Sequence, residues 1–129
     1  MSNGYQSKNV LKQQTAVVIG ASETDTPITN EFRMSGEDSK YFLARIDANT
    51  VTVTNAVTAN LQHSWDGGTT WEDVGSGAQV AIAGNDTYQI ELEYTAANTT
   101  LTWPLARIVV TSGVDDAATI AAVYISRRL

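Results

Sequence analysis

The chain has 129 residues, no cysteine and a formal net charge of −6 at pH 7. This length fits one domain with its own hydrophobic core, and the absence of cysteine excludes disulfide bonds and thiolate metal sites. No apolar run approaches the roughly 20 residues of a membrane-spanning helix, and the polar start has no secretory signal pattern. We therefore expect no membrane partner.

The charges are distributed unevenly along the chain. All fourteen acidic residues lie between Glu23 and Asp116. Near the two ends the charged residues are basic: Lys8, Lys12, Arg127 and Arg128. Residues 15–126 hold four basic and fourteen acidic residues, a net charge of −10. Such a body repels the phosphate backbone, so we predict no nucleic-acid partner. The basic ends are suited to an acidic protein surface, including that of a neighbouring copy.

Residues 1–14 are predicted to form an extended polar arm. Their only sizeable apolar side chains after the initiator methionine are Tyr5, Val10 and Leu11. A segment of this composition buries too little apolar surface to fold by itself. The remainder, residues 15–129, contains no linker and is predicted to be a single domain.

After residue 15 the dominant pattern is an alternation of apolar and polar side chains, which is typical of half-buried antiparallel strands. It is clearest from Val51 to Trp65, with a bend or bulge expected at Asn55-Ala56, and from Tyr88 to Tyr94. Shorter predicted strands are 16–19, 28–34, 41–47, 71–74, 79–83, 101–110 and 119–127. Glycine-containing turn sequences separate several of them. We predict an all-β fold, an antiparallel β-sandwich or jelly-roll with an extended N-terminal arm.

The segment from Ser64 to Trp71 reads Ser-Trp-Asp-Gly-Gly-Thr-Thr-Trp, which matches Ser-x-Asp-x-Gly-x-Thr-Trp at every defined position. It resembles the Asp-box of sialidase-type propellers and other β-proteins, where the motif is structural and lies away from catalytic residues. We expect a hairpin turn in which Asp66 accepts backbone N–H bonds, both glycines take positive φ and the second tryptophan folds back over the hairpin. The predicted turn residues are Ser64, Asp66, Gly68, Thr70 and Trp71. A ligand or metal role for Asp66 is the alternative.

The residues typical of catalysis are scarce. His63 is the only histidine, and its place on the apolar side of a predicted strand indicates a core or interface residue. Zinc ligation and Ser–His–Asp or Cys–His catalysis therefore lack components. Three acidic pairs lie in or near turns and are expected to be solvated charge, with weak calcium binding as the alternative: Glu37-Asp38, Glu72-Asp73 and Asp115-Asp116. We predict no enzyme, no catalytic residue, no metal and no cofactor.

Five aromatic residues could form a sugar-binding platform: Trp65, Trp71, Trp103, Tyr88 and Tyr94. Strand parity argues against this, because most of them alternate in step with apolar residues such as Leu61 and Ile90. We therefore expect most of these rings to point into the core.

Several segments together resemble small virion proteins of tailed phages. They span roughly residues 32–128: Phe32–Gly36, Tyr41–Ala44, Ser64–Gly75, Pro104–Val110 and Ala122–Arg128. The resemblance implies a capsid decoration (cement) protein, made in the host cytoplasm, that binds the major capsid protein on the outer shell surface and stabilises the capsid. It also implies a homo-oligomer, with a trimer favoured and a dimer possible. The arm lies outside the resemblance.

The residues themselves indicate where such a partner would be contacted. The hypothesis combines the apolar and basic residues of the arm with the basic end of the chain: Lys8, Val10, Leu11, Lys12, Arg127 and Arg128. Two alternatives remain open. One is a carbohydrate-binding or host-adhesion module, and the other is a structural component of the phage tail or neck.

Overall fold

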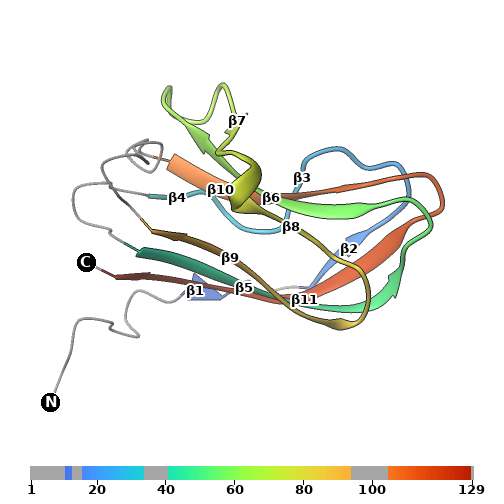
Figure 1. The fold of residues 1–129 in the computed structure, drawn as a ribbon. Helices are drawn as coiled ribbons and strands as arrows, with labels where there is room; N and C mark the ends of the chain where they lie inside the picture. The colour runs from blue at the N-terminus through green and yellow to red at the C-terminus, as the bar shows by residue number, and fades with distance from the viewer. Residues whose placement is uncertain (1–10, 13–15, 34–40, 94–104, 129) are drawn as a thin grey trace, which may run out of the picture.

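The computed structural model describes residues 11–12, 16–33, 41–93 and 105–128. In these residues the chain forms two antiparallel β-sheets that pack face to face (Figure 1). The predicted all-β sandwich is therefore confirmed. Of the predicted arm, Leu11 and Lys12 are described, and the rest of it lies outside the described residues. No helix in the described part of the chain is long and apolar enough to cross a membrane.

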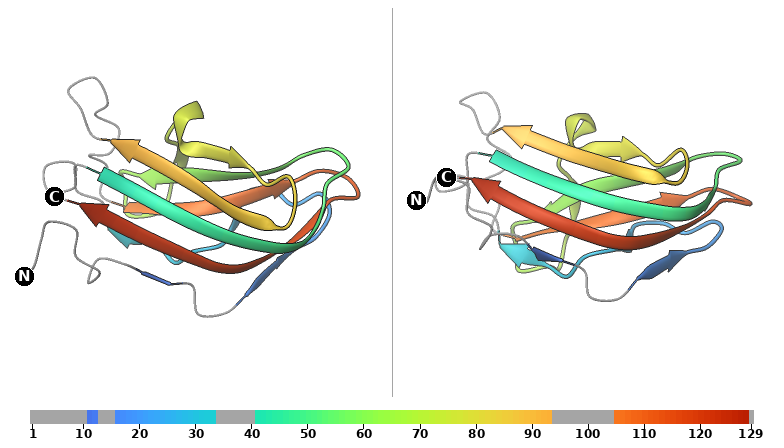
Figure 2. Two further views of the ribbon diagram at one scale, coloured as in Figure 1. Left: turned by 60° about the horizontal axis from the view of Figure 1, so that its bottom comes forward. Right: turned by 90° about the horizontal axis from the view of Figure 1, so that it is seen from below.

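The five-stranded sheet has the order β1-β11-β5-β9, and β2 also pairs with β11. Its central strand β5 pairs with β11 along one side and with β9 along the other, as both views of Figure 2 show. The strands are β1 (Leu11–Lys12), β2 (Val17–Ile19), β5 (Tyr41–Thr52), β9 (Asp86–Glu93) and β11 (Ala117–Arg128).

The six-stranded sheet has the order β3-β10-β6-β7, with β4 also pairing with β10 and β8 with β6. A short 3-10 helix, η2 (Ser76–Ala78), leads into β8. The strands are β3 (Thr26–Pro27), β4 (Phe32–Arg33), β6 (Val57–Ser64), β7 (Glu72–Asp73), β8 (Gln79–Ala81) and β10 (Leu105–Ser112).

Two crossovers between the sheets lie side by side. Residues 53–56 connect β5 to β6, and residues 113–116 connect β10 to β11. The break expected at Asn55-Ala56 within the alternating stretch from Val51 to Trp65 is present, but it is a crossover between sheets and not a bend or bulge within one sheet. The backbone N–H groups of the first crossover bond to the carboxylate of Asp116 in the second, so they have no need of a strand partner.

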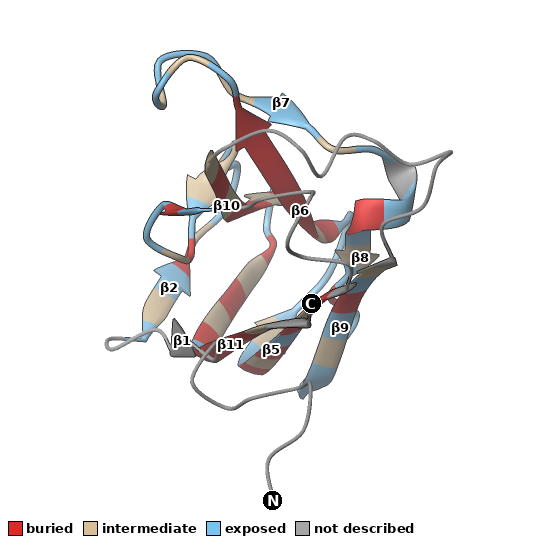
Figure 3. Ribbon diagram, turned by 90° about the vertical axis from the view of Figure 1, so that its left-hand side faces the viewer, coloured by how far each residue is buried: buried red, intermediate tan, exposed pale blue. Residues whose placement is uncertain are grey.

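The core lies between the sheets and is made by the inward side chains of both. Figure 3 shows the resulting alternation of buried and half-buried or exposed residues along β5 and β9. On β9 the expected alternation is confirmed, since Ile90 is buried while Gln89 and Glu91 are exposed. The rings of Phe32 and Phe42 stack across the core, with centroids 6.0 Å apart. Other fully buried members are Ile19, Ile28, Ile46, Leu61, Ile82, Ile108, Ile120 and Ile125.

Strand β6 departs from the expected alternation, because it is buried along both faces (Figure 3). The side chains of Asn60 and Gln62, predicted to face solvent, are only 9% and 4% exposed. Both edges of β6 are paired, by β10 on one side and by β7 and β8 on the other. The Gln62 side chain is in addition hydrogen-bonded on both sides, as described below. The side chains of the neighbouring strands therefore cover the outer face of β6 at Gln62.

The expectation that most aromatic rings lie in the core is wrong for Trp65, which is 62% exposed. β6 ends at Ser64, so the two-residue period no longer determines where the next side chain points. Tyr88 follows the prediction in part: it is half-buried against the core, and its hydroxyl donates to the Gly84 carbonyl at 2.7 Å. Tyr94 and Trp103 lie outside the described residues.

Candidate functional site

The loop of residues 65–71 joins β6 to β7 as an antiparallel hairpin, in which His63 pairs with Glu72. The buried Ser64 hydroxyl donates to Asp66 Oδ1 at 2.8 Å and accepts the Gly68 N–H at 2.9 Å. Asp66 Oδ1 also accepts the N–H groups of Thr69 and Thr70, at 3.1 and 2.8 Å. Gly67 and Gly68 have φ values of 77° and 97°. The turn hydrogen bonds and glycine conformations expected from the sequence are therefore present.

Asp66 is the charged hydrogen-bond acceptor of this loop. The backbone N–H of Thr70 holds the pKa of the Asp66 carboxyl down at about 2 against the opposing effect of burial, with further help from the Thr70 and Ser64 side chains and the Thr69 N–H. The group is thus ionised at neutral pH and stabilises the turn as an acceptor. Within the described residues, no three His, Asp or Glu side chains are grouped so that they could hold a metal ion.

Trp71 closes the loop and begins a chain of contacts across the outer face of the six-stranded sheet. Its indole Nε1 donates to the Gly68 carbonyl at 3.0 Å, so the ring folds back over the hairpin. The guanidinium carbon of Arg107 lies 4.3 Å from the centre of that ring, a cation–π distance. Arg107 Nε donates to Gln62 Oε1, and Gln62 Nε2 donates to Asp73 Oδ1, both at 3.0 Å.

The contacts of Arg107, Gln62 and Asp73 were not expected from the sequence. The three residues are direct neighbours on β10, β6 and β7, where Gln62 pairs with both of the others. Arg107 is 45 residues from Gln62 along the chain. Only the strand register brings them together, and no local sequence signal reports that register. The sequence did predict the turn of residues 64–71 that positions Trp71.

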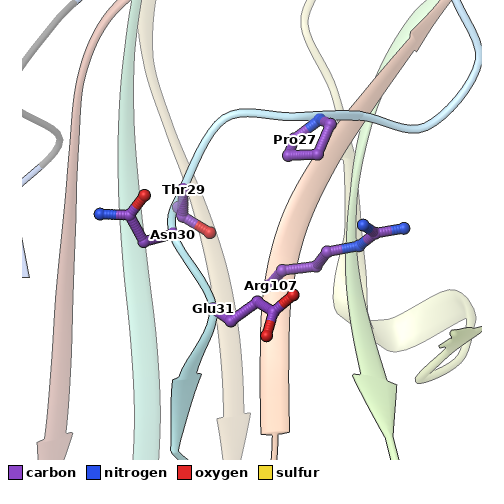
Figure 4. A pocket seen from close by; sticks show the side chains of 5 residues that line it. All are labelled: Pro27, Thr29, Asn30, Glu31 and Arg107. Carbon is purple, nitrogen blue, oxygen red and sulfur yellow. The ribbon is translucent and has the colours of Figure 1, made fainter. Parts of the chain in front are cut away.

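A cavity of about 430 Å³ lies beside Arg107 and opens on the same outer face. Its lining comes from the segment between β3 and β4 and from β10: Pro27, Thr29, Asn30, Glu31 and Arg107 (Figure 4). Thr29 Oγ1 accepts the Ile108 N–H at 3.0 Å, which fixes this segment to β10. The Glu31 carboxylate borders the hairpin loop, since a Cβ atom at Gly68 would lie 3.2 Å from Glu31 Oε1. The cavity and the hairpin loop are therefore adjacent.

Most residues of the partner-contact hypothesis lie on β1 and β11, at one side of the five-stranded sheet. Leu11 and Lys12 form β1, in which they pair with Ile125 and Tyr124 of β11. Arg127 and Arg128 lie in the same strand β11. Lys12 thus pairs with a position three residues before Arg127, although the two are far apart in sequence. Lys8 and Val10 lie outside the described residues.

Two of the predictions about titratable residues agree with the structure. His63 is buried within β6, as expected of a core histidine. Glu72 and Asp73 are exposed, as expected of surface charge. The pair Glu37-Asp38 lies outside the described residues.

The prediction of solvated charge is wrong for Asp116, whose residue surface is only 1% exposed. Its Oδ1 accepts the N–H groups of Thr54 and Asn55, and its Oδ2 accepts those of Ala56 and Gly113, at distances from 2.5 to 2.9 Å. These bonds, the one from Asn55 foremost, lower the pKa of the Asp116 carboxyl to about 2, although burial opposes them. The carboxylate joins the two crossovers.

No family model matches the chain, and no curated protein sequence matches it. Solved structures show similarity of shape. One is the enzymatically active domain of tailspike protein 4 of bacteriophage CBA120, with 13% identity and a TM-score of 0.50 over 98% of this chain and 21% of the tailspike chain. Another is a low-affinity xylan-binding module of Roseburia intestinalis, with 10% identity and a TM-score of 0.48 over 92% of this chain and 94% of the module.

A third similar structure is a disulfide-linked pilus protein of Bacillus endospore appendages, with 12% identity and a TM-score of 0.46 over 94% of this chain and 89% of the pilus chain. This chain spans about a fifth of the tailspike chain that it matches. At these identities the similarity concerns the fold alone.

Proposed function

We propose that the chain is a non-enzymatic virion structural protein, a capsid decoration protein that binds the major capsid protein on the outer shell surface. The proposal rests on the resemblance of residues 32–128 to small virion proteins of tailed phages. A decoration protein needs a rigid body and a contact surface that can reach neighbouring subunits. The two-sheet core supplies a rigid body, and repeated attachment around a shell makes modest contacts sufficient for firm binding.

One observation carries the choice of contact surface. β1 pairs with β11, so Lys12 lies on the strand next to Arg127 and Arg128. The rest of the chain, residues 15–126, has a net charge of −10. Three basic residues near the two ends, Lys12, Arg127 and Arg128, therefore lie on two neighbouring strands of an otherwise acidic protein. Such an edge is complementary to an acidic surface on the capsid protein or on a second copy. We refer to Lys12, Arg127 and Arg128 as the basic edge.

The test is co-sedimentation with capsids of the source virus from which this protein has been removed. We expect the Arg127→Gln/Arg128→Gln double variant to lose about tenfold or more in apparent affinity, and to lose more at low than at high salt. The matched control is Arg33→Gln/Arg107→Gln, which removes the same charge from the six-stranded sheet. Equal losses in both double variants, or none in either, would contradict the basic edge as the contact surface.

The copy number per virion tests the decoration role independently of the residues. Hundreds of copies per particle, measured by quantitative mass spectrometry of purified virions, agree with a shell protein. Six or twelve copies would instead assign the chain to the tail or neck, and absence from the particle would overturn a virion role altogether.

A further inference from the structure

We propose that the hairpin loop and the cavity beside it form a binding site for a neutral oligosaccharide, a function in addition to capsid decoration. The site comprises the exposed indole of Trp65, the stacked pair of Trp71 and Arg107, and the carboxylate of Glu31. It lies on the six-stranded sheet, whereas the basic edge lies on the five-stranded one. One surface can therefore attach the protein while the other remains available.

Trp65 is the apolar platform of the site. Its residue surface is 62% exposed, and within the described residues it makes no hydrogen bond or ring contact. The loop that carries it is held in place by Ser64 and Asp66, so the indole is displayed on a fixed turn. An exposed, preorganised indole is suited to pack against the C–H face of a sugar ring at a low entropic cost.

The neighbouring polar groups are suited to hydroxyl groups. Arg107 has five N–H donors, and in the described part of the chain only its Nε–H has a hydrogen-bond partner. Figure 4 shows its side chain extending from β10 away from Glu31. Arg107 lines the cavity and also contacts the Trp71 ring at 4.3 Å. Glu31 is exposed and has no hydrogen-bond partner among the described residues. Together they offer donors and acceptors, the combination that a sugar hydroxyl needs.

The charges favour a neutral ligand over an acidic one. A carboxylated sugar bound to Arg107 would also meet Glu31, Asp73 and the field of a body with a net charge of −10.

The experiment is a glycan array that carries both neutral and acidic oligosaccharides, followed by calorimetric titration of the full chain with the strongest neutral binder. We expect Trp65→Ala and Glu31→Gln each to weaken binding by about tenfold or more. Val114→Ala is the matched control, since it truncates another exposed apolar residue, 63% exposed, in the crossover of residues 113–116. It should bind like the wild type. Melting temperatures verify that each variant is folded.

Three results would overturn the proposal: no neutral oligosaccharide binds, acidic glycans alone bind, or Trp65→Ala binds as well as the wild type does. Co-sedimentation with capsids distinguishes a failure of the glycan proposal from a failure of the decoration proposal. Trp65→Ala should still bind capsids through the basic edge. If the chain binds neutral glycans but no capsid, the result would support the glycan site and contradict the decoration role.

Discussion

At the scale of single residues, Asp116 is a buried carboxylate that joins the two crossovers through backbone hydrogen bonds. Each of its carboxylate oxygens accepts two backbone N–H groups. In Asp116→Asn one oxygen becomes an NH₂ group, which places donors against donors in a buried position. We expect the variant to melt about 5 °C or more below the wild type by differential scanning calorimetry. Asp115→Asn is the control, because Asp115 is exposed and asparagine tolerates its positive φ of 66° equally well.

The same carboxylates predict how stability depends on pH. The pKa values of Asp66 and Asp116 in the folded protein are about 2, below the value of about 3.9 for aspartate in an unfolded chain. Because the folded pKa is the lower one, the stabilisation is complete above about pH 4 to 5 and is lost as the pH falls toward 2. Chemical denaturation at pH 7 and near pH 2.5 measures this loss. The loss should be smaller in Asp116→Asn, and an equal loss would contradict the assignment.

At the scale of secondary-structure elements, the two crossovers behave as one unit. A Cβ atom at Gly113 would lie 2.8 Å from Asn55 Cβ in the opposite crossover and 2.9 Å from Asp116 Oδ2. Gly113→Ala therefore has to push the crossovers apart, and we expect a loss of about 2 kcal/mol in the free energy of unfolding. Gly77→Ala is the control, because nothing lies within 4 Å of its added Cβ atom. Urea denaturation compares the two, and a Gly113→Ala variant as stable as Gly77→Ala would disprove the clash.

The elements also show how much of the fold was predictable. The alternation of Tyr88, Ile90 and Leu92 identified β9, because only one face of that strand packs on the core. The turn at Ser64–Trp71 was predictable in detail, since its hydrogen bonds join residues within four positions of one another. Local chemistry of this kind can be read from the sequence.

What the sequence did not predict depends on register. The burial of Gln62 on the supposed polar face of β6 requires Arg107 and Asp73 on either side, and the sequence does not say which strands become neighbours. The same holds for Asp116, whose partners in the first crossover lie 60 to 62 residues away. The exposure of Trp65 was missed for a simpler reason, since the strand ends one residue earlier. The candidate glycan site is therefore a product of tertiary structure, apart from its turn.

At the scale of the whole molecule, an acidic body with a basic edge predicts self-association between copies. If the basic edge of one copy contacts the acidic body of the next, the assembly is held in part by charge and weakens as salt screens it. We expect light scattering to give the mass of a trimer or dimer at low salt. We also expect that mass to fall toward 13.9 kDa, the mass of one chain, near 1 M salt, where the Debye length is about 3 Å.

Deletion of residues 1–14 tests whether the basic edge holds the copies together. It removes β1 and Lys12 but leaves the strands that form the core. The truncated chain should fold and have the mass of a monomer at every salt concentration. An oligomer that persists in the truncated chain would mean that another surface holds the copies together. If the full-length chain is monomeric at low salt, the basic edge does not bind a second copy in solution. Its partner would then be the capsid protein, and copies would assemble only on the shell.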